Sequence, residues 1–257
     1  FMLSAQLLVS HSAAAVVTEA TFRMEGFAFG WWFVTVHFFL FALFALIHLI
    51  VIPWLRQGPN GHPVTGALWR VVRVYAWLVH RTTFVGMEKI RAEIFAGPLI
   101  VVSNHTGAID PLLVQAGCRF HIRWMMASEM MATSLDWLWH HQQPIPVDRD
   151  GKDSGPAREA IRHVQAGGVV GIFPEGRIVQ PPRQLRPFFQ GIGLIVARSK
   201  APVLLVWVSD TPNTTRMNES LFTPSRARVE YLELIDFKDE RDAHVITERL
   251  RDRLAVL

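Results

Sequence analysis

One short segment of the sequence combines two side chains that can move a proton. In Asn104-His105-Thr106-Gly107-Ala108-Ile109-Asp110, an imidazole and a carboxylate are five positions apart. An ideal helix would place them about 140° apart around its axis, so a loop turning at Gly107, and not a helix, can pair them. The Asp110 carboxylate would then hold one nitrogen of His105 and leave the other free to take a proton from a hydroxyl. The alternative is that Asp110 only caps a helix and that His105 is an exposed loop residue.

Two predicted strands would bring this segment and a second one to the same place. The continuous, β-branched run Leu99–Ser103 predicts a buried strand that ends directly before Asn104. The similar run Val169–Phe173 leads into Pro174-Glu175-Gly176-Arg177. Sites in such sheets lie at the carboxyl ends of the strands, so both loops would share one edge if the strands are parallel.

Strand and helix patterns alternate through the rest of the chain. This alternation predicts an α/β domain over residues 84–257, with a mixed, mostly parallel sheet flanked by helices. Strands are expected at Ile122–Ala127, Ile145–Val147, Pro202–Val208 and, as an edge strand, Val229–Leu234. Helices are expected to start at Asp110, where Asp and Pro favour a helix beginning, and to cover Pro156–Gln165, Phe188–Ser199 and Ala243–Leu254.

An uncharged run at residues 26–55 predicts a transmembrane or membrane-embedded helix. It contains no Asp, Glu, Lys or Arg and exceeds the roughly 20 apolar residues that a helix needs to cross a bilayer. Trp31 and Trp54 would lie roughly 34 Å apart, close to the separation of the two aromatic belts. Arginines follow the run, so the positive-inside rule places the α/β domain on the cytoplasmic side of the cell membrane. A buried core helix and a re-entrant hairpin are the alternatives to this single span.

The segments on either side of this run have different expected roles. Residues 1–25 are an N-terminal extension, in which no Lys or Arg precedes the apolar stretch as it would in a signal peptide. Residues 56–83 comprise a turn-rich linker and a helix whose apolar positions interleave with Arg70 and Arg73. This basic, amphipathic helix is predicted to lie near lipid headgroups, and packing on the following domain is the alternative.

The composition excludes several classes of protein. Half of the 257 residues are hydrophobic, 19% are charged and the formal net charge is +4, which excludes a disordered chain. The single cysteine, Cys118, excludes an intrachain disulfide and a Cys-rich zinc module. One His and one Asp are too few ligands, so no metal is expected. The basic residues cluster beside the apolar run, which favours a lipid bilayer over nucleic acid as the partner.

Four segments together resemble the glycerolipid acyltransferase superfamily, whose best-known bacterial members acylate lysophosphatidic acid to phosphatidic acid. Asn104-His105, followed by Asp110, matches the HX4D motif, and Phe173-Pro174-Glu175-Gly176 matches the FPEG motif. Ile145-Pro146-Val147-Asp148-Arg149 lies between them, and an apolar block at residues 201–206 follows. The resemblance covers roughly residues 85–210, and the combination is far more specific than one motif alone.

The resemblance implies a reaction and a role for each residue. His105 would be the general base and Asp110 its orienting partner, with no acyl-enzyme and no cofactor. An acyl group would pass from the thioester of acyl-CoA or acyl-carrier protein to the hydroxyl of a lysolipid. The guanidinium of Arg149 would hold an anionic headgroup. The full set of implied substrate-binding residues is Asn104, Arg149, Glu175, Gly176 and Arg177.

The departures from the family pattern keep other functions open. In the family, the arginine that follows the FPEG motif usually comes one position later than Arg177 does here. The resemblance therefore supports the reaction class more strongly than it supports a particular acceptor. An acyltransferase for a lipid other than a phosphatidate precursor is therefore an alternative. A thioesterase or lipid hydrolase is a further one, which the lack of a G-x-S-x-G segment disfavours. A non-catalytic membrane scaffold with the same fold is the last.

Overall fold

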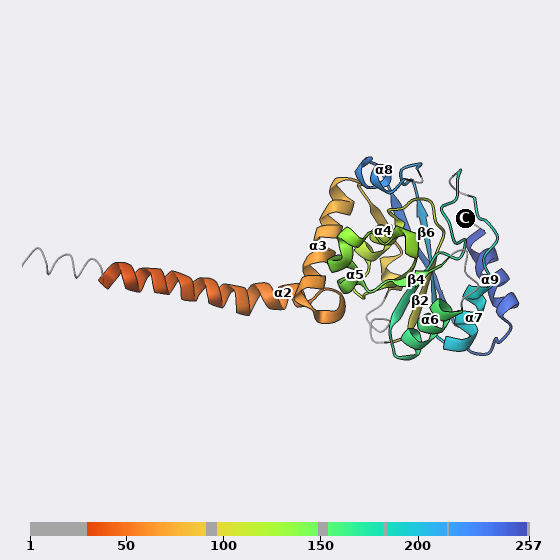
Figure 1. The fold of residues 1–257 in the computed structure, drawn as a ribbon, viewed down its shortest axis with the longest axis horizontal. Helices are drawn as coiled ribbons and strands as arrows, with labels where there is room; N and C mark the ends of the chain where they lie inside the picture. Colours follow the sequence, from red (N-terminus) through yellow and green to blue (C-terminus); the bar gives the residue numbers. More distant parts are fainter. Residues whose placement is uncertain (1–29, 91–96, 149–153, 182–183, 215, 256–257) are drawn as a thin grey trace, which may run out of the picture. The chain divides into compact units, whose positions relative to one another are not determined.

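The computed structural model describes residues 30–90, 97–148, 154–181, 184–214 and 216–255 (Figure 1). The predicted extension at residues 1–25 and Arg149, which is predicted to hold an anionic headgroup, lie outside these residues. The chain divides into two compact units, Phe1–Trp54 and Leu55–Leu257.

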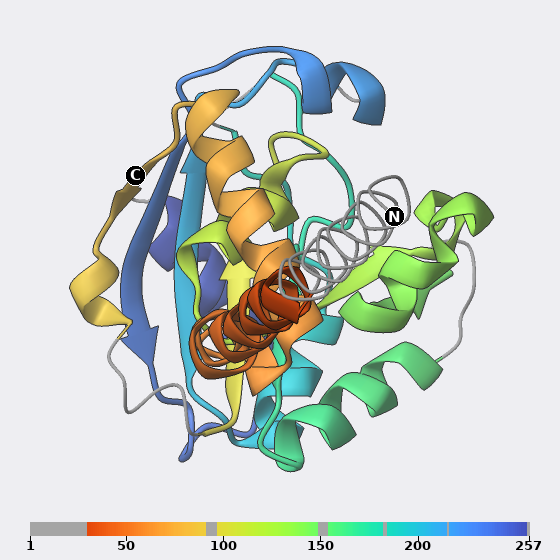
Figure 2. The same cartoon turned by 90° about the vertical axis from the view of Figure 1, so that its left-hand side faces the viewer.

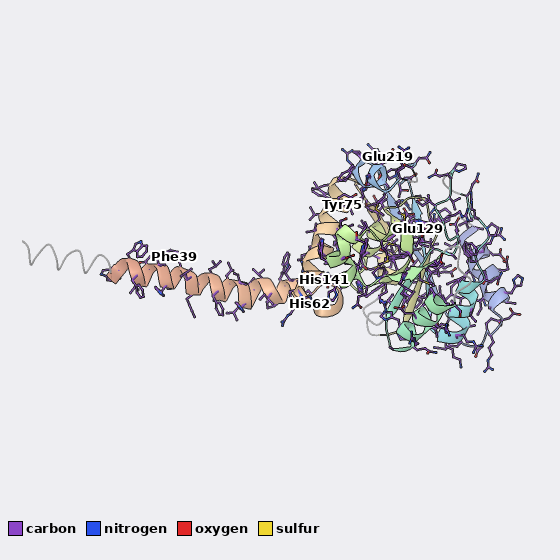
Figure 3. The ribbon with its side chains drawn as sticks, in the orientation of Figure 1. Phe39, His62, Tyr75, Glu129, His141 and Glu219 are labelled. Atoms are coloured by element: carbon purple, nitrogen blue, oxygen red, sulfur yellow. The ribbon has the colours of Figure 1, made fainter. Side chains whose placement is uncertain are left out.

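One long apolar helix, Gly30–Arg56, accounts for the described part of the first unit and runs into the second. Its length and composition would allow it to cross a membrane, and none of its most apolar window is buried by the rest of the chain. Figure 3 shows side chains projecting from it on all sides, with Phe39 among them. The helix has no hairpin between Gly30 and Arg56. It widens to a π-helix at Ile47–Val51 just before Pro53, whose ring would otherwise clash with the preceding turn.

The second unit is built around a seven-stranded sheet in its described residues, in the order β1-β7-β6-β2-β5-β3-β4. Every neighbouring pair is parallel except β6 and β7, so the predicted mixed, mostly parallel sheet is confirmed. The strands are β1 (Thr83–Val85), β2 (Leu99–Ser103), β3 (Arg123–Ala127), β4 (Ile145–Val147), β5 (Val169–Ile172), β6 (Val203–Ser209) and β7 (Arg228–Ile235).

Helices cover both faces of the sheet, as Figure 2 shows. The helices of the second unit are α3 (Pro63–Leu78), α4 (Asp110–Gly117), α5 (Asp136–Gln142), α6 (Gly155–Gln165), α7 (Gly191–Ser199), α8 (Met217–Phe222) and α9 (Ala243–Ala255). The last turns of the long apolar helix are α2 (Ile52–Arg56). Single 3-10 turns lie at Pro59–Gly61, Met87–Lys89, Ser128–Met130 and Thr133–Leu135.

The alternation of side chains along the central strands separates two hydrophobic cores. Ile100 and Val102 of β2 face a core that α6, α7 and α9 complete. Leu99 and Val101 of the same strand face the opposite core, to which α3 and α4 contribute. All five residues of β2 are buried, which explains why its sequence is a continuous apolar run and not an alternating one.

The structure corrects two of the predicted elements. The predicted edge strand is β7, which lies between β1 and β6, because the three-residue β1 pairs with its outer side. The helix expected from Phe188 begins only at Gly191, since the Phe189 N–H donates to the carbonyl of Pro174 instead of entering a helix. Gly193 of that helix lies against the Ala243 carbonyl of α9, where a Cβ would have no room. The helix is therefore part of the core.

A buried histidine joins α3 to the segment that follows α8. Nδ1 of His80 lies 2.8 Å from the Ser225 hydroxyl, and Nε2 lies 2.9 Å from the hydroxyl of Tyr75. Tyr75 donates its own proton to the Leu221 carbonyl at 2.6 Å, so Nε2 of His80 must carry the hydrogen. Burial of the imidazole lowers the pKa of His80, and the folded chain therefore favours its neutral form.

This network predicts an acid-sensitive junction. The unfolded chain protonates His80 near pH 6.5, whereas the folded chain resists protonation. The contribution of His80 to stability is therefore complete above about pH 6.5 and declines as the pH falls below it. We expect Tm to fall between about pH 8 and about pH 5.5 by roughly 2–4 °C more in the wild type than in His80→Gln. Thermal unfolding of the full chain in detergent measures this difference, and equal losses in the two proteins would contradict it.

Candidate active site

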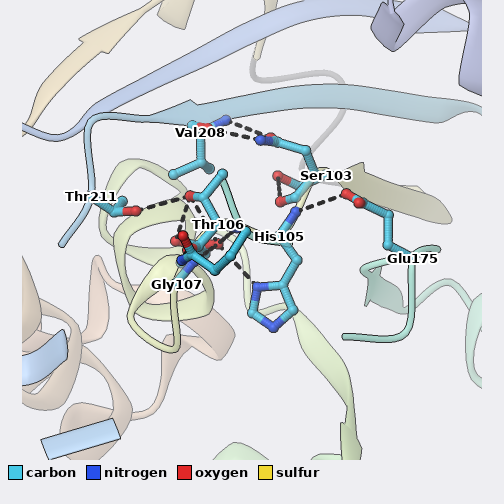
Figure 4. A network of polar contacts seen from close by, with 10 residues as sticks. Ser103, His105, Thr106, Gly107, Glu175, Val208 and Thr211 are labelled. Atoms are coloured by element: carbon cyan, nitrogen blue, oxygen red, sulfur yellow. Dashed lines mark hydrogen bonds and ion pairs between the residues drawn. The ribbon is translucent and has the colours of Figure 1, made fainter. Parts of the chain in front are cut away.

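The two predicted functional loops meet at one edge of the sheet. Strands β2 and β5 are parallel neighbours in register, with Val102 opposite Ile172, so the chain leaves both strands at the same edge. The residues after β2 carry His105 and those after β5 carry Glu175. Figure 4 shows these two residues side by side, linked through the backbone of His105.

His105 and Asp110 form the predicted pair. Nδ1 of the imidazole lies 3.0 Å from Oδ2 of the carboxylate. The side chain of His105 is 15% exposed and that of Asp110 is fully buried, so the ring is the part that an incoming molecule can reach. Among the described residues, Nε2 of His105 has no hydrogen-bond partner. The nitrogen that faces outward is therefore the one available to accept a proton.

The loop folds around the Asp110 carboxylate. Oδ2 accepts hydrogen bonds from the backbone N–H groups of Thr106 and Gly107, at 2.6 and 2.9 Å. Asp110 is the first residue of α4, with Pro111 after it, and it lies where the helix dipole favours an acidic side chain. Its carboxylate reaches back to the loop instead of capping the helix alone. The alternative of a simple helix cap beside an unpaired His105 does not fit this geometry.

The side chain of Asn104 connects the start of the loop to the neighbouring strand β6 through two hydrogen bonds. Its amide nitrogen donates to the Val208 carbonyl at 2.8 Å, and its amide oxygen accepts from the Val208 N–H at 2.7 Å. The side chain is 1% exposed. This geometry favours a positioning role for Asn104 over contact with substrate.

The carboxylate of Glu175 forms a hydrogen bond with the other side of the loop. One carboxylate oxygen accepts from the His105 N–H and the other from the Arg186 N–H, both at 3.1 Å. Burial raises the pKa of Glu175, and the two backbone hydrogen bonds only partly oppose this. The carbonyl of His105 in turn accepts from the Val179 N–H at 2.8 Å. Both backbone groups of His105 are thus held by the segment that follows β5.

The remaining predicted residues of this segment lie beside the same loop. Gly176 has a φ of +69°, a conformation that glycine adopts without strain, and a Cβ there would collide with the Phe189 ring. Arg177 is exposed, and it lies between Glu175 and Val179, which both bond to His105. The structure therefore brings Gly176 and Arg177 to the edge that carries His105.

Three aromatic rings form a stack that ends in the imidazole. The ring centroids of His105 and Phe173 are 4.1 Å apart with 18° between their planes, and those of Phe173 and Trp124 are 4.7 Å apart with 11°. The Trp124 ring lies over Gly171, where a Cβ would collide with the indole. The hydrogen bond to Asp110 holds one edge of the imidazole but leaves the ring free to tilt about that edge. The stacking contact with Phe173 fixes this tilt.

Local sequence patterns do not reveal the stack or Thr211, whose hydroxyl lies 2.9 Å from that of Thr106. The pairing of Trp124 with Gly171 across β3 and β5 would have been visible only with the strand register known. In the described residues, no group of three His, Cys, Asp or Glu side chains could hold a metal ion. The pairing of His105 with Asp110 suits the abstraction of a proton by the imidazole.

The structure thus places an imidazole, held by a carboxylate, at the edge of an α/β sheet, beside a loop that contains a glycine with a positive φ. A family profile described as Acyltransferase matches residues 81–209, half of the chain, and the protein belongs to this family. The resemblance that the HX4D and FPEG motifs indicated is confirmed, and the protein is an acyltransferase.

A solved structure has the same fold. It is the crystal structure of the 1-acyl-sn-glycerophosphate (LPA) acyltransferase, PlsC, from Thermotoga maritima. The TM-score is 0.60 at 19% sequence identity, and the match covers 74% of this chain and 77% of that chain. No curated protein sequence matches this chain.

The aromatic stack leads to a prediction about Phe173. Replacing it in Phe173→Leu keeps an apolar side chain of similar size but removes the ring face against His105. An aromatic pair of this kind contributes about 0.5–1.5 kcal/mol, so we expect kcat for acyl transfer to fall about two- to tenfold. Steady-state kinetics measure this change, and Phe173→Tyr, which keeps the ring, is the matched control. Equal kcat values for the Leu and Tyr variants would show that the stack does not position the base.

Proposed function

We propose that this acyltransferase moves a fatty acyl group from the thioester of acyl-CoA or acyl-carrier protein to the hydroxyl of a lysophospholipid, such as 1-acylglycerol-3-phosphate. The observation that carries the proposal is the 3.0 Å contact between His105 Nδ1 and Asp110 Oδ2 at the sheet edge. This contact leaves Nε2 of His105 available as the general base, which is the role that the resemblance to the HX4D motif implies for this residue.

The proposed reaction needs one base and no covalent intermediate on the enzyme. Nε2 of His105 takes the proton from the acceptor hydroxyl while the oxygen attacks the thioester carbonyl. The new ester C–O bond forms, the C–S bond breaks, and the thiolate leaves with the proton that the imidazole returns. Asp110 stabilises the imidazolium that exists between these steps and keeps the ring oriented.

The proposal assigns the headgroup to two arginines. Arg177, and Arg149 outside the described residues, supply guanidinium groups for an anionic headgroup. Glu175 and Gly176 shape the acceptor site through the backbone they hold. The PlsC enzyme of similar fold acts on 1-acyl-sn-glycerophosphate, which supports this acceptor as the first to test.

The proposed location is the cell membrane. The helix Gly30–Arg56 would anchor the chain, and the arginines that follow it favour the cytoplasmic side for the α/β unit. A lysolipid acceptor and its acylated product would then both remain in the bilayer. An acceptor other than a phosphatidate precursor is the second candidate, because Arg177 departs in position from the family pattern.

The base assignment predicts a large loss of turnover in two variants. His105→Ala removes the base, and Asp110→Asn removes the carboxylate that orients it, so we expect each to lower kcat at least about a hundredfold. The assay supplies a panel of lysolipids with both thioester donors and measures acylated lipid and free fatty acid separately. His105→Ala is expected to fold normally, because its side chain is partly exposed.

Other outcomes of this assay would contradict the proposal. Full activity in His105→Ala would exclude the base, and a loss of activity that only followed a loss of folding would give His105 a structural role. Free fatty acid without acylated lipid would indicate a thioesterase or lipid hydrolase instead.

The headgroup assignment predicts an effect on binding rather than on chemistry. Because an exposed guanidinium binds the phosphate equally in the ground and transition states, Arg177→Ala should raise KM for lysophosphatidate about tenfold and change kcat little. Arg177→Lys should restore part of the loss, since it keeps the charge but not the fork of donors. Arg149→Ala is expected to act in the same direction. Arg253→Ala on α9 is the matched control, and an equal rise in KM in that variant would refute a local effect.

A further inference from the structure

The two oxygens of the Asp110 carboxylate have different surroundings. Oδ2 accepts hydrogen bonds from the ring of His105 and from the backbone N–H groups of Thr106 and Gly107, at 3.0, 2.6 and 2.9 Å. For Oδ1 the described residues provide one donor, the hydroxyl of Thr106, which lies 3.4 Å from each carboxylate oxygen. Bulk solvent does not reach Oδ1, because the side chain is fully buried. The stabilisation of the charge on Oδ1 therefore depends on how strongly Thr106 donates.

The hydroxyl of Thr211 lies beside the hydroxyl of Thr106. Thr211 belongs to the loop that leads from β6 to α8, and its Oγ1 is 2.9 Å from Oγ1 of Thr106 (Figure 4). A carboxylate has no proton to give, so Thr106 donates to Asp110, and its own oxygen is left to accept from Thr211. The donors thus run from Thr211 through Thr106 to Asp110. Hydrogen bonds in such a chain polarise and strengthen one another.

Helix α8 places a third hydroxyl, that of Ser220, beside the backbone of Gly107. A Cβ on this glycine would lie 3.2 Å from Oγ1 of Thr211, 3.4 Å from Oγ of Ser220 and 3.5 Å from Oδ1 of Asp110. Ser220 is fully buried, and among the described residues its hydroxyl has no hydrogen-bond partner. A buried hydroxyl gains free energy when it finds an acceptor, and the oxygen of Thr211 keeps lone pairs after donating to Thr106. Ser220 is therefore suited to donate to Thr211.

We propose that Thr211 is a positioning residue for the base, because through Thr106 it strengthens the hydrogen bond to Oδ1 of Asp110. The Ser220 hydroxyl donates to Thr211 in turn. We call the side chains of Thr106, Thr211 and Ser220 the hydroxyl relay. The proposal rests on the proposed function in that His105 is the base, but it holds for any acceptor lipid and for either thioester donor.

The hydroxyl relay has a defined effect on the imidazole. Hydrogen bonds to a carboxylate spread its negative charge, so the carboxylate attracts the proton of an imidazolium less strongly. With the relay, His105 therefore stays neutral, and able to take a proton from a hydroxyl, to a lower pH than without it. The relay extends the pH range of the base without touching the substrate.

The pH dependence of acyl transfer by the full chain in detergent tests the hydroxyl relay. Thr211→Val keeps the shape of the side chain but removes its hydroxyl, and Ser220→Ala removes the donor to Thr211. We expect the acidic limb of kcat/KM to move to higher pH by about 0.3–0.5 units in Thr211→Val, and in the same direction in Ser220→Ala. On this limb Thr211→Val then loses about two- to threefold in kcat/KM, whereas the plateau at higher pH stays within about twofold of the wild type. Thr211→Ser keeps the hydroxyl and should restore the wild-type limb.

Thr247→Val on α9 is the matched control. The buried Thr247 donates to the Ala243 carbonyl of its own helix, so its loss is expected to leave the acidic limb in place. The titratable and charged side chains described around the relay are the same in every variant. They are His105, Asp110 and Glu175, the exposed Arg177 and Asp210, and the ion pair of Arg216 with Glu219.

The possible outcomes separate the relay from the proposed function. A loss of kcat/KM that is uniform over pH, or that Tm shows to follow from unfolding, would give Thr211 a structural role and overturn the relay. An equal shift of the limb in Thr247→Val would overturn it as well. If Thr211→Val does not fold, an unmoved limb in Ser220→Ala overturns the relay, and a limb moved to higher pH supports it. Absence of acyl transfer in the wild type would overturn the proposed function and the relay with it.

Discussion

A single oxygen atom, Oδ2 of Asp110, accepts hydrogen bonds from two backbone N–H groups and from the ring of His105. The two backbone bonds fix the turn through Thr106 and Gly107, and the third fixes the imidazole on that turn. The carboxylate is fully buried, where such bonds are stronger than in water. The shape of the loop and the orientation of its base therefore depend on one group. Neither can change without leaving buried polar atoms unpaired.

Three other side chains at the same edge of the sheet hold this loop in place. Asn104 bonds to β6, and Glu175 bonds to the backbone of His105 and Arg186. Phe173 holds the face of the imidazole. Sites built in this way lose little entropy when a substrate binds, since the reactive group is already oriented. The ring of His105 is partly exposed and Arg177 is exposed, and these are the two groups of the described residues that are proposed to contact substrate.

Much of this arrangement could be predicted from the sequence, because it rests on local patterns. The run Leu99–Ser103 is apolar on both faces, so its burial and its strand character follow directly, and the loops after two such strands meet once the strands are parallel. The position of β7 could not be predicted, because its outer neighbour β1 is too short to give a periodic signal. The stack of Trp124 on Phe173 depends on which residues face each other across strands, and this register is a property of the assembled sheet.

Because β7 comes late in the chain and pairs with the early strand β1, the sheet can be completed only near the end of synthesis. β1 leaves the ribosome early and β7 only near the end of the chain, and β7 pairs with both β1 and β6. The apolar helix precedes all of them and can enter a bilayer while the sheet still lacks its last strands. The nascent chain would then be tethered at one end through most of translation. Until β7 arrives, the outer edge of β6 stays unpaired, and a membrane-held chain is less able to aggregate through that edge than a freely diffusing one.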